Sequence, residues 1–369
     1  MLSKYGMIMF IRENGHNRIF AGILPRALCL SLAFSSSLAL AGCMPSSDAA
    51  SSQIAAAMEN GDFANAVAIA DGVLSGGEAG KEILRLRGIA KMGAGDYSAA
   101  AADLLEALSL SNGMVDASDI DTSYYLAVAQ YKTGDKNECE TTLSAITDIK
   151  PKEDKAYLLR GKVRLSEGDK EAAKADFDKA ISLAPTKYDY YVQIYEELLG
   201  AGYESEGNAY LEKALAVGSK LSDYYKGVLE YYMGAYTDAR NDLENAGKSK
   251  DDENIVLYLG KTYEALGDSA YAVTLYEQFI QSGKESGKIY EELSYLKMNQ
   301  KDYEGALGII ETGLNLGGSE GKRGMMFNRI VAYENLYDFS AAKEAAKEYL
   351  ELYPDDQDAL RENIFLSSR

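Results

Sequence analysis

The feature that most constrains the fold of this chain is a pattern of about 34 residues that returns along most of its 369 residues. Its clearest copy, residues 157–185, reads YLLRGKVRLSEGDKEAAKADFDKAISLAP. Gly161 is followed twelve residues later by Ala173, and an aromatic residue, Phe177, follows after four more. Small side chains at the first two positions let two antiparallel helices approach closely, and Phe177 fills the space between neighbouring helix pairs. Gly168 can adopt the left-handed conformation that ends one helix, and the closing proline cannot continue the next.

The same frame fits the chain nine times. Its copies begin at Ser47, Lys81, Ile120, Asp154, Tyr188, Lys220, Glu253, Gly287 and Arg323. Consecutive starts lie 32 residues apart at the closest, between Tyr188 and Lys220, and 39 at the widest, between Lys81 and Ile120. The small position of the second helix is occupied by Ala66, Ala100, Cys139, Ala173, Gly207, Ala239, Ala272, Ala306 and Ala342. A period of this length indicates a stack of repeats rather than separate globular domains.

This spacing of small, aromatic and proline positions resembles that of the tetratricopeptide repeat (TPR) family. The tryptophan of the family pattern is absent, and Tyr157, Tyr191 and Tyr290 stand in its place. The resemblance implies an all-α fold, a right-handed α-superhelix of about nine helix-turn-helix repeats whose first helices line a concave face. We therefore expect a repeat array in residues 53–354 and a capping helix in residues 355–369, which covers the last apolar face.

The chain begins with a segment typical of a signal peptide. Residues 27–40, ALCLSLAFSSSLAL, form an apolar run of 14 residues, shorter than the roughly 20 that a membrane-spanning helix needs. The residues before this run carry an excess of basic side chains. A basic region followed by a short apolar run indicates a secretory signal peptide, here residues 1–42, with Met1, Met7 or Met9 as the initiator.

Leu40, Ala41, Gly42 and Cys43, which follow the apolar run, resemble the lipobox of bacterial lipoproteins. The resemblance implies cleavage before Cys43 and attachment of lipid to its thiol, with residues 43–52 forming the lipidated cysteine and a flexible linker. Two acyl chains make a durable membrane anchor. We therefore expect an extracytoplasmic protein anchored by lipid to the cell membrane, or to the outer membrane if the host has one.

Composition excludes several classes of function. The formal net charge of −19 disfavours nucleic acid as a partner. The single histidine, His16, lies in the basic segment, and Cys139 is the only cysteine after Cys43. Cys/His zinc sites and His-dependent nucleophilic catalysis are therefore excluded after Cys43. We predict no catalytic residue, metal site or cofactor, and no enzyme activity.

Two further features are expected to be structural. Cys139 occupies a small buried position of the third repeat, which favours a small apolar residue over a reactive thiol. Asp116, Asp119 and Asp121 lie in the longest joint between repeats, and they lack the glycine and closing glutamate of a calcium-binding loop. We expect a solvated acidic loop there.

The resemblance places positions 2, 5, 9, 12 and 13 of each first helix on the concave face. The candidate binding residues there are Tyr124, Tyr131, Lys162, Tyr224, Val228, Tyr231, Tyr232, Lys261 and Tyr295. Tyrosine offers a large contact area at little cost in conformational entropy, which suits peptide recognition. The alternative is that these rings pack between helices. For the adjacent pair Tyr231 and Tyr232 we favour the groove.

These observations lead to two hypotheses of function. The first is a membrane-anchored TPR lipoprotein that binds a protein or peptide and acts as a scaffold or assembly factor at the cell envelope. A basic partner would suit the acidic chain. The second is a lipoprotein that binds a solute or glycan in a groove lined by tyrosines, because aromatic faces also stack on sugars.

Overall fold

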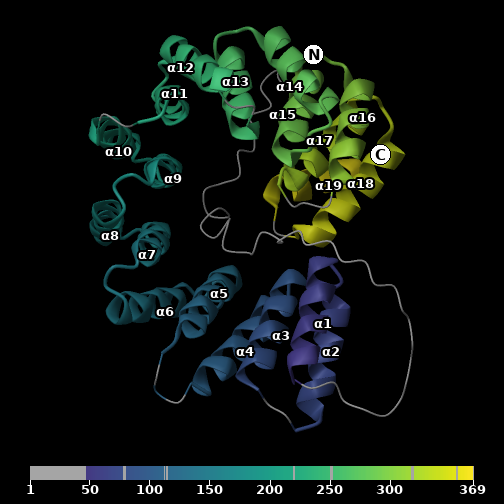
Figure 1. Cartoon of the computed structure of the whole chain (residues 1–369). Helices are drawn as coiled ribbons and strands as arrows, with labels where there is room; N and C mark the ends of the chain where they lie inside the picture. Colours follow the sequence, from purple (N-terminus) through teal and green to yellow (C-terminus); the bar gives the residue numbers. More distant parts are fainter. Residues whose placement is uncertain are drawn as a thin grey trace. The chain divides into compact units, whose positions relative to one another are not determined.

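The computed structural model describes residues 47–77, 80–111, 113, 115–218, 221–249, 252–316, 320–354 and 356–368. Over these residues the chain forms nineteen helices and no strand, which confirms the all-α solenoid predicted from the repeats (Figure 1). The signal peptide predicted in residues 1–42 and the lipidation site Cys43 lie outside the described residues.

The helices divide between two compact units, Met1–Ala214 and Leu215–Arg369, called here the N-terminal and C-terminal units. The N-terminal unit contains α1 (Ser47–Glu59), α2 (Phe63–Ser75), α3 (Lys81–Gly93), α4 (Tyr97–Ser109), α5 (Ala117–Thr133), α6 (Lys136–Ile149), α7 (Asp154–Ser166), α8 (Lys170–Leu183), α9 (Tyr188–Gly200) and most of α10 (Glu204–Ala216). The C-terminal unit contains α11 (Asp223–Tyr232), α12 (Tyr236–Ser249), α13 (Glu253–Ala265), α14 (Ser269–Gln281), α15 (Gly287–Asn299), α16 (Tyr303–Leu314), α17 (Lys322–Asn335), α18 (Phe339–Leu352) and α19 (Gln357–Ser367).

Aspartates cap the second helices of most repeats. The side chains of Asp62, Asp96, Asp169, Asp268, Asp302 and Asp338 each accept a hydrogen bond from the backbone N–H three residues further on. The residue before each of these aspartates has a positive φ. In four of these turns the residue is glycine. It is Lys301 in the eighth repeat and Tyr337 in the ninth, both with φ 61°. These two turns adopt the same geometry at a cost of roughly 1 kcal/mol each.

The small residues of the repeat lie where the helices of a pair meet. A Cβ atom at Gly161 would lie 2.6 Å from the Phe177 ring, and Ala173 is fully buried. Cys139 is also fully buried, and its Sγ donates to the Ala127 carbonyl at 3.2 Å. Burial raises the pKa of the Cys139 thiol to about 12, so this residue acts as a small apolar side chain, as the repeat predicts.

The flexible linker predicted in residues 43–52 is too long. Helix α1 begins at Ser47, and its Ala50 and Ile54 are fully buried against α2 and α3. Residues 47–52 therefore belong to the first repeat. The linker prediction failed here because alanine and serine, which dominate the start of α1, are also typical of flexible segments.

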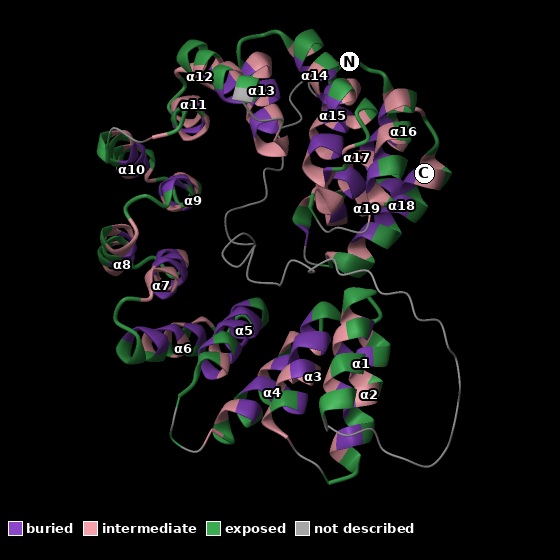
Figure 2. Ribbon diagram, in the orientation of Figure 1, coloured by how far each residue is buried: buried purple, intermediate pink, exposed green. Residues whose placement is uncertain are grey.

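The acidic joint before the third repeat is a solvated loop only in part, because Asp116 and Asp121 are exposed whereas Asp119 is buried. Asp116 caps α5, and its side chain and that of Asp119 form a reciprocal capping box with each other's backbone N–H. Asp119 is only 2 % exposed, and its Oδ1 lies 2.6 Å from the ammonium of Lys81. Figure 2 shows that α5 is buried along most of its length. The aspartates thus fix the start of this helix.

The last helix, α19, closes the C-terminal unit within the predicted residues 355–369. Its Ala359 and Leu366 pack against α18. Asp356 caps α19 and also accepts hydrogen bonds from Arg323 at 2.7 Å and from the Tyr349 hydroxyl at 2.6 Å. One buried carboxylate therefore connects α17, α18 and α19.

Candidate functional site

In the N-terminal unit the three predicted binding residues are buried between first helices. Lys162 on α7 is 2 % exposed, and its ammonium lies 2.9 Å from Gln193 Oε1 and 3.5 Å from Glu197 Oε1 on α9. Tyr124 and Tyr131 on α5 are 6 % and 9 % exposed, and the Tyr124 hydroxyl donates to Glu153 at 3.2 Å. Burial raises the pKa of both phenols. These contacts hold α5, α7 and α9 together, so a partner has little access to these side chains.

In the C-terminal unit the predicted residues of α11 divide into core and surface. Val228 is 3 % exposed and belongs to the core. Tyr224, Tyr231 and Tyr232 are half-buried. The Tyr231 and Tyr232 rings lie edge to face, 5.4 Å apart between centroids. Three of the four α11 candidates therefore keep part of their surface in contact with solvent.

A tyrosine that the family frame does not place on this face completes the cluster. Tyr258 on α13 lies 5.8 Å from the Tyr231 ring and 6.0 Å from the Tyr232 ring, and its hydroxyl is 3.2 Å from that of Tyr232. The frame assigns the groove position to its neighbour Leu257, which is 7 % exposed and packs in the core. Only the helix packing brings Tyr258 to this face.

Charged side chains adjoin these tyrosines. The Lys261 ammonium lies 2.5 Å from Glu292 Oε1 on α15. Burial acts to lower the pKa of Lys261, but the negative charge of Glu292 outweighs burial, so the pKa is raised. Glu264, one turn after Lys261 on α13, has a raised pKa because it is partly buried and lies near Glu292. The pKa of Tyr295 on α15 is raised by burial and by the charges of Glu264 and Glu292.

These residues form one surface, because α11 contacts α13 and α13 contacts α15. We call it the aromatic-acidic face, and it consists of Tyr231, Tyr232, Tyr258, Lys261, Glu264, Glu292 and Tyr295. Its two carboxylates and one ammonium give it a net negative charge. It offers ring surfaces and carboxylate oxygens, both of which attract cations.

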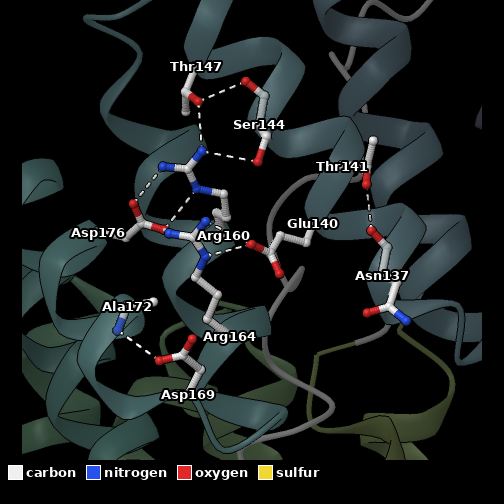
Figure 3. A network of polar contacts seen from close by, with 10 residues as sticks. All are labelled: Asn137, Glu140, Thr141, Ser144, Thr147, Arg160, Arg164, Asp169, Ala172 and Asp176. Atoms are coloured by element: carbon white, nitrogen blue, oxygen red, sulfur yellow. Dashed lines mark hydrogen bonds and ion pairs between the residues drawn. The ribbon is translucent and has the colours of Figure 1, made fainter.

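A different set of polar contacts holds helix pairs together. Arg160 on α7 donates from Nε and Nη2 to the two oxygens of Asp176 on α8, at 2.8 and 2.7 Å (Figure 3). Arg164 Nη1 reaches the same carboxylate at 2.9 Å, and Arg160 Nη1 also donates to Ser144 and Thr147. Asp176 is 3 % exposed. The buried carboxylate thus receives two guanidinium groups.

The second repeat has the same arrangement, which the sequence reasoning missed. Arg87 forms a bidentate pair with Asp103, sixteen residues later, and Lys91 adds a second cation at 2.7 Å. Arg160 and Asp176 have the same separation, and so do Lys226 and Asp242, whose charged atoms lie 2.6 Å apart. This recurring separation of sixteen residues is the signal that could have revealed the pairs.

In the sixth repeat the second cation is replaced by an acid. Glu230 follows Lys226 by four residues, as Lys91 follows Arg87 and Arg164 follows Arg160. Its side chain is 13 % exposed, and Lys226 lies 3.4 Å away. Burial, and then the neighbouring Asp242 carboxylate, raise the pKa of Glu230 to about 7, although Lys226 opposes the shift. Two carboxylates therefore share one lysine.

We expect this carboxyl pair to make the C-terminal unit less stable at high pH. Unfolded Glu230 ionises near its usual pKa of 4.5, whereas the folded residue keeps its proton up to about 7. Its stabilising contribution is therefore present at low pH and is lost between these two values. Glu230→Gln should match the wild type at pH 4, below the unfolded pKa, and exceed it by about 1 to 2 kcal/mol at pH 8 in urea unfolding. A pH-independent difference between the two would contradict this interpretation.

Neither a metal-binding cluster nor a membrane-spanning helix is found in the described parts of the chain. No group of three or more His, Cys, Asp or Glu side chains is placed there to hold a metal ion. None of the helices described combines the length and the apolar character needed to cross a membrane.

Comparison with known proteins identifies the repeats. Family profiles described as "Tetratricopeptide repeat" match residues 91–163, 154–187 and 256–282. These segments include α7 and α8 of the N-terminal unit and most of α13 and α14 of the C-terminal unit. No curated protein matches the chain.

Several solved structures resemble parts of the chain. The crystal structure of MamA is 24% identical and covers 44% of this chain and 93% of its own, with a TM-score of 0.38. A tetratricopeptide repeat protein from Parabacteroides merdae is 15% identical and covers 67% of this chain and 98% of its own, with a TM-score of 0.44. Pseudomonas aeruginosa pilF is 19% identical and covers 58% of this chain and 97% of its own, with a TM-score of 0.36. These similarities say nothing about the partner of this chain.

Proposed function

This chain carries tetratricopeptide repeats, and we propose that it is a membrane-anchored lipoprotein that binds a protein or peptide partner at the cell envelope. The observation that supports binding most directly is the aromatic-acidic face, which sets half-buried tyrosines beside carboxylates on three adjacent first helices. Half-buried tyrosines offer contact area that a partner can cover at little entropic cost.

A protein partner is favoured over a small solute by the shape of the surface. Small-molecule sites are usually concave and mostly apolar, with walls from several elements. The aromatic-acidic face instead extends along several helices, which suits an extended segment of a protein.

The sequence around Cys43 supports the envelope location. Ser47, where α1 begins, is four residues after Cys43, a separation of at most about 14 Å in an extended chain. A lipid on Cys43 would therefore hold the first repeat close to the membrane surface.

We expect Cys43→Ser to release the chain from membranes, or to leave it uncleaved, because serine cannot accept the thioether-linked lipid. The measurement is fractionation of cells followed by detection of the chain and its size. Cys29→Ser, a matched change inside the apolar run, should leave anchoring unaltered. A membrane-bound chain of mature size in the Cys43→Ser variant would contradict the proposed anchor.

The scaffold role is tested by recovering partners from detergent-solubilised envelopes. We expect a stoichiometric protein partner on the wild-type chain and much less of it on the double variant Tyr231→Ala, Tyr232→Ala. Retention of a glycan with no stoichiometric protein would instead support the alternative function.

A further inference from the structure

Three surface sites in the N-terminal unit show how this chain binds a lysine side chain. In each, an ammonium lies over a tyrosine ring and pairs with a carboxylate. Lys170 lies 4.6 Å from the Tyr203 centroid and 3.0 Å from Glu206. Lys213 lies 4.5 Å from the Tyr210 centroid and 2.9 Å from Asp178. Lys187 lies 5.1 Å from the Tyr190 centroid and 2.6 Å from Asp154.

The energetic basis of these sites is simple. A ring face attracts a cation because its quadrupole is negative there, and the carboxylate adds a charge-assisted hydrogen bond. The two attractions act on the same ammonium, while the lysine stem covers apolar surface beside the ring. A tyrosine beside a carboxylate that lacks its own cation is therefore a receptor for a cation from elsewhere.

The aromatic-acidic face contains such a tyrosine and carboxylate. Within the described residues the Glu264 carboxylate accepts no hydrogen bond and forms no ion pair. Lys261, one turn before it, lowers the pKa of Glu264 by its charge but forms its ion pair with Glu292. Glu264 and Tyr295 each lie three residues after one member of the Lys261–Glu292 ion pair, on the contacting helices α13 and α15, which places them side by side one turn further along. In agreement with this placement, the charge of Glu264 raises the pKa of the Tyr295 phenol. Both side chains are half-buried, so neither is closed off from a partner.

We propose that the aromatic-acidic face binds a protein segment through one lysine or arginine side chain, which pairs with Glu264 and lies against the Tyr295 ring. Residues flanking that side chain in the partner contact Tyr231, Tyr232 and Tyr258. The net negative charge of the face complements the cation. This inference rests on the proposed function and adds the chemistry of the residue that is recognised.

The test is an unbiased selection of displayed peptides on the full chain, because it requires no known partner. We expect the selected peptides to share a lysine or arginine at one position. On Glu264→Gln this enrichment should disappear, and on Glu264→Lys the same position should favour aspartate or glutamate. Glu304→Gln, an exposed glutamate on the second helix α16, is the matched control and should select the same peptides as the wild type.

A selected peptide then gives a quantitative check. Replacing its basic residue by norleucine should weaken binding to the wild type about tenfold, equal to about 1.4 kcal/mol, and binding to Glu264→Gln less than about twofold. Circular dichroism and thermal unfolding should show that Glu264→Gln folds like the wild type.

The outcomes separate this inference from the function on which it rests. Peptides without a basic preference, or with one that survives Glu264→Gln, would overturn the cation site and leave peptide binding intact. If no peptide is selected above the background of an unrelated protein, both the cation site and peptide binding at this face are contradicted.

Discussion

Replacing Asp176 with alanine is expected to lower the free energy of unfolding by about 3 to 5 kcal/mol. The change removes the one carboxylate that pairs with both Arg160 and Arg164 between α7 and α8. An arginine guanidinium stays protonated at any ordinary pH, so Arg160 keeps its charge when its partner is gone. A buried charge without a counter-charge is far more costly than the pair is stabilising. Urea unfolding followed by circular dichroism measures the loss.

Asp178 provides a control on the same helix. It also receives two cations, Lys174 and Lys213, and a hydrogen bond from the Tyr210 hydroxyl at 3.2 Å, but its side chain is 42 % exposed. Solvent screens such pairs, so Asp178→Ala should cost about 1 kcal/mol or less. Equal losses for Asp176→Ala and Asp178→Ala would show that burial of the carboxylate does not determine its contribution.

Asp356→Ala is expected to detach the closing helix α19 from the C-terminal unit. Asp356 caps α19 through the backbone N–H groups of Asp358 and Ala359 and binds Arg323 and Tyr349. Loss of a cap alone costs about 1 to 2 kcal/mol, and the unpaired Arg323 adds to this. Amide hydrogen exchange in residues 357–367 should accelerate at least about a hundredfold, which corresponds to about 2.7 kcal/mol of local stability.

The pattern of exchange distinguishes a local from a global effect. Asp358→Ala, which removes a partly exposed carboxylate on α19 paired with the exposed Arg361, should leave exchange in the helix within about threefold of the wild type. Protection in α11 to α16 should be unchanged in both variants. Uniform loss of protection over the whole unit in Asp356→Ala would contradict the local role of this carboxylate.

The parts of the fold that were predictable from sequence are those with strict local requirements. A turn glycine or its substitute before a capping aspartate, and a small residue five positions after that glycine, locate each helix pair from a few neighbouring positions. The observed starts of α1, α3, α7, α9, α13 and α15 coincide with the predicted repeat starts. Cys139 was correctly interpreted because its position in the repeat, not its chemistry, decides its surroundings.

The candidate site was less predictable, because contacts between helices depend on spacings that differ among repeats. Lys162 occupies a groove position in the family frame, yet it is buried against Gln193 and Glu197 of the next first helix. Tyr258 was missed because it is one position away from those that the frame assigns to the groove. Whether a side chain is open or covered depends on its neighbour one repeat away, which a single repeat pattern does not specify.

The ionic pairs illustrate a different kind of omission. Arg160 and Asp176 are sixteen residues apart. Helix assignment from sequence depends on the periodicity of apolar residues, to which these two charged residues do not contribute. Their significance emerges from comparison among repeats: the position of Lys91 and Arg164 is occupied by Glu230 in the sixth repeat. That exchange of a cation for an acid can be read from aligned repeats, because Lys91, Arg164 and Glu230 each stand ten residues after the start of their repeat.

The central claim is that a protein partner binds the aromatic-acidic face of the C-terminal unit. Its most direct test is photocrosslinking in living cells with a photoreactive phenylalanine at position 232, compared with the same residue at position 337. Tyr337, in the turn before α18, is 80 % exposed and lies outside the face, so it offers a reactive group with greater access to solvent. We expect a discrete adduct with one protein from position 232 and not from position 337. The same adduct from both positions, or none from position 232, would contradict this claim.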